Sequence, residues 1–308
     1  MHISKPLIIL KRLGIIVAAL FLLGIVACLV LDQFVQFRMS DEELTEFFQK
    51  ENTPATIRYY QSHGRTLRYV SIGDTSKPAL LFIHGSPSSL SIYKAYYKDS
   101  LFLNTFHMLA VDRPGYGNSG LGRPEGSIIR QAAMIKPILD SLHHAERPVM
   151  IMAGSYGTSI ACRIAMDFPH LVDGMVLVAP SLAPGRETVF WITPIVELPL
   201  FNWFIPRMLR TANTEKLAHR KELEKMLPYW QNVKIPIVYI QGQKDEIIDT
   251  SNATFARRQL KAVPYLEINM LKNRKHFLAY VAQPLIRRKI LELHERLQRI
   301  IGVKQETE

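Results

Sequence analysis

The chain of 308 residues is long enough for one domain of about 250 residues, whose core would need no disulfide bridges. Its two cysteines, Cys28 in an apolar N-terminal run and Cys162 in an expected helix, exclude a disulfide-built fold and say little about redox compartment. The net charge of +11 comes largely from lysines and arginines late in the chain, which we interpret as solvated helix faces, with attraction to anionic lipid headgroups as a secondary hypothesis.

Residues 13–31 form an uninterrupted apolar run of nineteen residues. As a helix it would span about 28 Å, close to the thickness of a hydrocarbon core, so it can cross a bilayer once. Basic residues precede the run and Asp32 follows it, so the positive flank is expected to stay in the cytoplasm. We therefore predict that residues 1–35 form a cytoplasmic tail and a transmembrane signal anchor, with the rest of the chain on the extracytoplasmic side.

A cleaved signal is the competing interpretation of this segment. The sequence Ile25-Val26-Ala27-Cys28 resembles a bacterial lipoprotein processing box that ends at Cys28, although its first two residues are unusual and the apolar run continues beyond it. With either anchor the following domain stays on a membrane surface, which in a bacterium is the periplasmic face of the inner membrane. Nucleic acid is therefore not an expected partner.

A short helix is expected to join this anchor to the main domain. Ser40 and Glu43 have the spacing of a capping box, in which each side chain accepts a hydrogen bond from the other residue's backbone amide. We predict a helical linker over residues 36–55 that acts as a spacer.

Strand and helix patterns alternate through the rest of the chain. Two strands, 57–61 and 66–72, flank a turn and predict an antiparallel hairpin. Six further apolar strands are separated by helical segments, and they are expected at 79–83, 106–111, 149–152, 175–178, 235–240 and 266–270. Such alternation predicts a mostly parallel sheet with helices on both faces, in a domain over residues 56–302 with a C-terminal tail at 303–308.

Ser155 lies at the expected turn between the strand that ends at Met152 and the helix over 158–167, within the sequence Ala-Gly-Ser-Tyr-Gly at 153–157. Small residues on both sides of a serine allow the sharp turn of a nucleophile elbow, here with Ala153 in place of the first glycine. A serine hydroxyl needs a base, an acid that orients the base, and hydrogen-bond donors for the oxyanion that it creates.

Candidates for these partners follow in the order acid, then base. Asp245 comes just after the expected strand 235–240 and is the candidate acid, with Glu246 and Asp249 as competitors in the same loop. His276 follows the last expected strand, leads into a helix that begins near residue 278, and is the candidate base.

The oxyanion donors are expected from the backbone. The strand 79–83 ends in His84-Gly85-Ser86-Pro87, and Gly85 permits a turn that points an amide inward. We assign the oxyanion hole to the N–H groups of Ser86 and Tyr156, the latter at the start of a helix whose dipole also favours negative charge. His84 is expected to brace this loop. The glycine-rich loop at 112–120 lacks the spacing of a phosphate-binding motif and is interpreted as structural.

Together these motifs resemble the capped branch of the α/β-hydrolase family over roughly residues 56–300. The matching segments are His84-Gly85-Ser86-Pro87, residues 112–119, the Ser155 turn, Gly242-x-x-Asp245 and His276-Phe277. The resemblance implies a hydrolase that works through an acyl-enzyme. Haloalkane dehalogenases and epoxide hydrolases are similar at 84–87 but carry an aspartate where this chain has Ser155, so carbonyl substrates are favoured.

The resemblance also implies a small helical cap in the insertion at about 181–232. A nearly all-apolar stretch at 189–206 lies within it, and its prolines exclude one straight transmembrane helix. We leave three interpretations open: the core of the cap, an acyl-binding pocket and contact with lipid.

The sequence thus predicts a membrane-anchored serine hydrolase that cleaves a small or lipid-derived carboxylic ester. The ten histidines are scattered, so neither a metal site nor a cofactor is expected. One alternative is an amidase similar to proline iminopeptidases, in which Glu187, Glu197, Glu215 or Glu222 of the cap would bind a substrate amine. A non-catalytic, membrane-tethered binding protein is the other.

Overall fold

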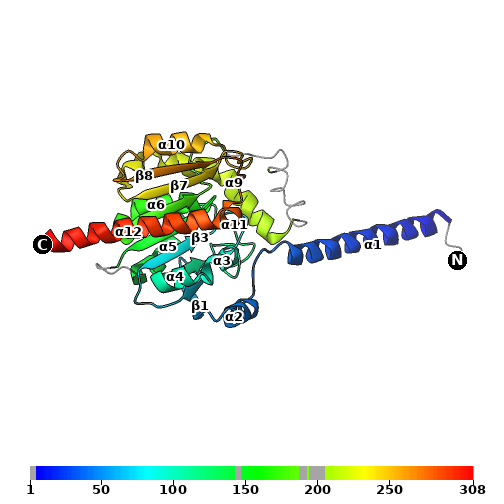
Figure 1. Cartoon of the computed structure of the whole chain (residues 1–308). Helices are drawn as coiled ribbons and strands as arrows, with labels where there is room; N and C mark the ends of the chain where they lie inside the picture. The colour runs from blue at the N-terminus through cyan, green and yellow to red at the C-terminus, as the bar shows by residue number, and fades with distance from the viewer. Residues whose placement is uncertain (1–4, 143–146, 187–192, 194–204, 308) are drawn as a thin grey trace.

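The computed structural model describes residues 5–142, 147–186, 193 and 205–307, and it is built around one eight-stranded sheet (Figure 1). The strand order is β1-β2-β4-β3-β5-β6-β7-β8. The β1–β2 and β2–β4 pairs are antiparallel and the remaining pairs are parallel. The strands are β1 (Ala55–Ser62), β2 (Arg65–Ile72), β3 (Ala79–Ile83), β4 (His107–Val111), β5 (Val149–Gly154), β6 (Gly174–Val178), β7 (Ile237–Gly242) and β8 (Leu266–Leu271).

All eight predicted strands are present, and the α/β-hydrolase fold is confirmed. The strand predicted at 235–240 begins two residues late, at Ile237, because Pro236 has no N–H to donate to a neighbouring strand. The Pro236 carbonyl still accepts a hydrogen bond from Met175.

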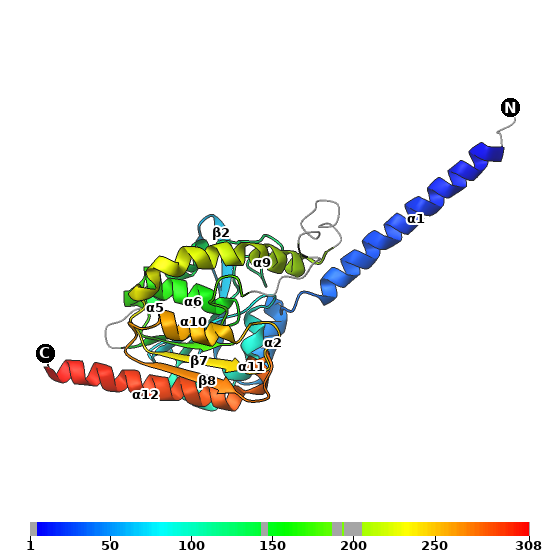
Figure 2. The ribbon, with the colours of Figure 1, turned by 90° about the horizontal axis from the view of Figure 1, so that it is seen from above.

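Helices cover both faces of the sheet (Figures 1 and 2). They are α1 (Lys5–Phe34), α2 (Asp41–Lys50), α3 (Lys94–Tyr97), α4 (Ser100–Thr105), α5 (Ile128–Leu142), α6 (Gly157–Asp167), α9 (Arg207–Met226), α10 (Ser251–Gln259), α11 (Leu278–Val281) and α12 (Gln283–Thr307), with 3-10 turns η1 (Leu90–Tyr93), η2 (Pro169–Leu171) and η3 (Leu227–Asn232).

Each central strand contributes to two hydrophobic clusters, one on each face of the sheet. In β5, Ile151 packs in the cluster that contains α5, α6 and α10, whereas Met150 and Met152 pack in the cluster that contains α2, α3, α4 and α12. This division follows from the two-residue period of a strand. Both faces are buried, which explains why these strands read as continuous apolar runs rather than alternating ones.

The N-terminal helix α1 projects away from the sheet (Figures 1 and 2). Its segment Lys11–Phe34 is long and apolar enough to cross a membrane, and an 18-residue window within it has a mean hydropathy of 3.1 and is not buried in the protein. The end of α1 and the segment that follows it contact the domain: Asp32 pairs with Arg207 at the start of α9 at 2.7 Å, and Arg38, beyond α1, donates to the Gly117 carbonyl at 3.0 Å.

The predicted capping box is confirmed at the start of α2. The Ser40 hydroxyl accepts from the Glu43 amide, and the Glu43 carboxylate accepts from the Ser40 amide. This helix buries Leu44 and Phe48 in the core, so α2 packs firmly on the domain and does more than separate it from α1.

Of the insertion predicted at about 181–232, residues 181–186, Thr193 and 205–232 are described. Helix α9 lies in the last part of this insertion and packs beside α5 (Figure 2). Most of the apolar stretch 189–206, for which three interpretations were left open, lies outside the described residues.

Candidate active site

Ser155 occupies the sharp turn between β5, which ends at Gly154, and α6, which begins at Gly157. Its φ of 49° lies in the left-handed region, which a non-glycine residue adopts only when the surrounding structure holds it there. Gly157 is required because a Cβ at this position would lie 2.6 Å from the carbonyl oxygens of both Ile83 and His84. Ala153 fits in the preceding strand, where its side chain is fully buried.

His276 and Asp245 reach Ser155 from the ends of two neighbouring parallel strands, β8 and β7. The His276 Nε2 lies 3.1 Å from the Ser155 Oγ, and the His276 Nδ1 lies 2.9 Å from an Asp245 carboxylate oxygen. An ionised carboxylate can only accept, so Nδ1 carries a proton and Nε2 offers its lone pair to the serine hydroxyl. The geometry permits the serine to lose a proton to His276 as it attacks a carbonyl carbon.

The structure separates Asp245 from its two sequence competitors. The Asp245 side chain is fully buried, and it also accepts hydrogen bonds from the backbone amides of Ile247 and Ile248 at 3.0 and 2.9 Å. Glu246 instead pairs with Lys275 at the surface, and Asp249 accepts from the amide of Ser251. Of the three acids, Asp245 is the one that contacts His276.

The loop after β3 lies directly against Ser155. A Cβ at Gly85 would lie 2.9 Å from the Ser155 Cβ, so glycine allows the loop to approach the serine. In the described part of the chain, the amides of Ser86 and Tyr156 donate no hydrogen bond. Tyr156 precedes the first turn of α6, where the helix dipole favours an anion.

His84 braces this loop, as predicted. Its ring is fully buried, with Nδ1 2.7 Å from the Gly85 carbonyl and Nε2 accepting from the Arg113 amide at 2.9 Å. Burial, together with the nearby Arg113 guanidinium, lowers the pKa of His84 well below its usual value. A neutral ring suits both hydrogen bonds, since Nδ1 donates and Nε2 accepts.

Arg113 connects the loop after β3 to helix α9, a role that the sequence did not indicate. Its guanidinium donates to the carbonyls of His84 and Gly85 at 2.8 and 2.9 Å and forms a fully buried, two-pronged ion pair with Glu215 of α9. The hydroxyl of Tyr116 lies 2.7 Å from both the Glu215 carboxylate and the Ser86 hydroxyl. One buried network therefore joins α9 to the loop that carries the Ser86 amide.

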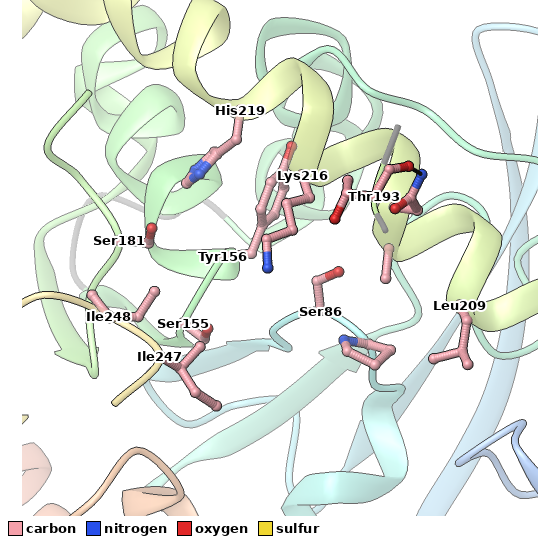
Figure 3. A pocket seen from close by; sticks show the side chains of 13 residues that line it. Ser86, Ser155, Tyr156, Ser181, Thr193, Leu209, Lys216, His219, Ile247 and Ile248 are labelled. Carbon is pink, nitrogen blue, oxygen red and sulfur yellow. Dashed lines mark hydrogen bonds between the residues drawn. The ribbon is translucent and has the colours of Figure 1, made fainter. Parts of the chain in front are cut away.

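Two cavities meet at Ser155. The α9 cavity, of about 290 Å³, lies between Ser155 and α9 and is lined by Ser86, Tyr156 and Lys216 among others (Figure 3). The α11 cavity, of about 590 Å³, extends from Ser155 and His276 past Phe277 to the segment 37–39 that follows α1.

The two described glutamates considered for binding a substrate amine are engaged elsewhere. Glu215 binds Arg113, and Glu222 accepts from the hydroxyl of Ser127 and the amide of Ile128. Neither glutamate lines the α9 cavity. Glu187 and Glu197 lie outside the described residues.

Comparisons with known proteins agree with this architecture. Residues 78–220 match a family model described as the alpha/beta hydrolase fold. A 3-oxoadipate enol-lactonase of Acinetobacter baylyi is 24% identical over 222 residues, which cover 61% of this chain and 79% of the lactonase. Epoxide hydrolase 1 of Caenorhabditis elegans is 26% identical over 197 residues, which cover 60% of this chain and about half, 48%, of that enzyme.

A solved structure of a membrane phospholipase A, a bacterial virulence factor, has the same fold. It superposes with a TM-score of 0.63 at 16% identity and covers 94% of this chain and 98% of the phospholipase.

Proposed function

We propose that this chain, whose residues 78–220 match a family model described as the alpha/beta hydrolase fold, is a serine hydrolase that cleaves a carboxylic ester through an acyl-enzyme. The observation that carries the proposal is the hydrogen-bonded chain from the Ser155 Oγ through His276 to the buried Asp245. A serine nucleophile suits acyl transfer, whereas a carboxylate nucleophile suits displacement at an alkyl carbon.

In the proposed mechanism His276 takes the Ser155 proton while the serine oxygen attacks the ester carbonyl. Asp245 holds the ring and stabilises the imidazolium that forms. The amides of Ser86 and Tyr156 donate to the tetrahedral oxyanion, and the proton on Nε2 then passes to the leaving alcohol. Water repeats the cycle to release the acid.

We further propose that α1 anchors the enzyme as a single-pass membrane helix, with the hydrolase domain on the extracytoplasmic side. The exposed apolar surface of Lys11–Phe34 and the basic flank before it support this topology. The α11 cavity reaches residues 37–39, directly after α1, which favours esters drawn from the membrane or its surface. Protease accessibility in sealed spheroplasts tests the topology, and protection of the domain from added protease would overturn it.

The catalytic proposal is tested on the full-length protein in detergent. We expect labelling by a fluorophosphonate probe and turnover of p-nitrophenyl esters, with both lost in Ser155→Ala. A folded wild-type protein that is inert to the probe and to every ester would refute the proposal. Turnover of aminoacyl arylamides without turnover of esters would replace it with the amidase alternative.

A further inference from the structure

Four large apolar side chains are exposed around one cavity of the domain. Outside α1, Phe277 (63%), Phe37 (58%), Tyr280 (55%) and Val281 (51%) are the described side chains of this kind that are more than half exposed. The first three line the α11 cavity, so they lie where it opens to the surface, and Val281 follows at the end of α11. The opening of the cavity that leads to Ser155 therefore has an apolar rim, and such a patch marks a contact site.

Helix α11 presents three of these side chains together. Tyr280 and Val281 follow Phe277 by three and four residues, so they share the outer side of the helix. Leu278, between them, is fully buried. The loop that leads into α11 carries three exposed basic side chains: Lys272, Arg274 and Lys275. Apolar and aromatic groups beside lysines and arginines suit the boundary between acyl chains and lipid headgroups.

The helix that can span a membrane leaves the domain on the side of this rim. In both views α1 and α11 lie on one side of the domain, and the C-terminal end of α12 lies on the opposite side (Figures 1 and 2). Phe37 is three residues beyond the end of α1, at most about 11 Å along the chain. A bilayer that holds α1 would therefore have its surface close to the opening of the α11 cavity.

The segment that carries Phe37 is fixed to the domain. The Ser89 hydroxyl donates to the Phe37 carbonyl at 2.7 Å, and the buried Arg68 guanidinium donates twice to the Met39 carbonyl at 3.1 Å. The ion pair between the end of α1 and the start of α9 adds a third attachment. These contacts keep α1 and the rim of the cavity in one arrangement.

We propose that α11 and Phe37 form a second membrane-contact surface, which holds the opening of the α11 cavity against the bilayer in which α1 is anchored. This inference rests on the proposed membrane anchor, and it adds one fixed orientation of the domain on the bilayer. An ester with long hydrocarbon chains then enters the cavity from the lipid without exposing those chains to water.

The orientation is tested with the full-length protein in vesicles of phosphatidylethanolamine and phosphatidylglycerol. Val281→Cys, in a Cys28→Ser background, carries the fluorophore NBD, while the fully buried Cys162 stays unlabelled. Ile300→Cys is the matched control, because Ile300 is a 40% exposed aliphatic residue in the C-terminal half of α12. We expect a blue-shifted emission and quenching by nitroxide lipids at position 281, and neither at position 300.

Three results would overturn the proposal. NBD that is unquenched at both positions in a vesicle-bound protein would place α11 in water. Equal quenching at both positions would show that the domain has no fixed orientation. A protein that does not float with the vesicles would refute the anchor and this inference with it.

Activity gives a second test, which separates the contact from the proposed ester hydrolysis. Val281 is not among the described residues that line the α11 cavity. Val281→Asp should lower the ratio of p-nitrophenyl palmitate turnover in vesicles to p-nitrophenyl butyrate turnover in solution by about 5- to 30-fold. Ile300→Asp should keep the wild-type ratio. An unchanged ratio in Val281→Asp would overturn the contact, whereas a folded wild type inert to both esters would refute ester hydrolysis and leave the fluorescence result to decide the contact.

Discussion

Replacing Glu215 by Gln should destabilise the protein more than any other single charge removal on α9. The Arg113 and Glu215 side chains are both fully buried, so the substitution leaves the guanidinium without a compensating charge. Breaking a buried pair in this way costs about 3–5 kcal/mol of unfolding free energy. Because the glutamine oxygen still accepts one hydrogen bond, we expect the lower end, about 3 kcal/mol.

For a domain of this size, 1 kcal/mol corresponds to a shift of about 2–4 °C in Tm, so Glu215→Gln should lower Tm by about 6–12 °C. Thermal unfolding followed by circular dichroism measures the shift. Ester turnover should also fall at temperatures where the variant is folded, since Arg113 holds the carbonyls of His84 and Gly85 beside Ser155.

Glu224→Gln on the same helix is the matched control. Glu224 pairs with Arg220 at 2.9 Å, but their side chains are 45% and 69% exposed, so its loss should change stability by no more than about 0.5 kcal/mol. Equal Tm shifts in the two variants would refute the reasoning, because burial would then make no difference to the cost of losing the charge.

Three further predictions concern the serine turn and the cap. Ser155→Ala should lower kcat for p-nitrophenyl esters by at least about 1000-fold and leave Tm nearly unchanged. Gly157→Ala should lower the unfolding free energy by about 1–3 kcal/mol in urea titrations and reduce turnover, because its Cβ would overlap the His84 carbonyl. For His219, burial lowers the pKa to about 3, whereas the unfolded chain protonates near its ordinary value of about 6.5. The unfolded state therefore binds more protons between these values, and stability should fall with decreasing pH by up to about 1.4 kcal/mol per unit, more steeply than in His219→Gln.

Each of these predictions has a result that contradicts it. Wild-type turnover in Ser155→Ala would show that another group attacks the substrate. A Gly157→Ala protein as stable as the wild type would mean that the turn can widen without cost. Identical pH slopes for wild type and His219→Gln would show that this ring takes up a proton as readily in the folded protein as in the unfolded chain.

The sheet could be predicted because its strands are short apolar runs between turn residues. The candidate site could be predicted because Ser155, Asp245 and His276 follow one another in the chain order serine, acid, base. The buried network could not be predicted. Arg113 and Glu215 are 102 residues apart, and nothing in the sequence distinguishes Glu215 from the exposed Glu224 on the same helix. The place of Lys216 in the α9 cavity depends equally on how α9 is rotated, which is decided by residues on its other side.

The packing of α9 also determines how often the space above Ser155 can open along this helix. Met208, Leu223 and Met226 are at most 1% exposed, and returning three such side chains to water costs about 5–9 kcal/mol. At equilibrium, fewer than about one molecule in a thousand would have α9 lifted from the domain. Helix α9 therefore acts as a fixed wall, and a ligand of Ser155 would have to enter through another part of the boundary of the site.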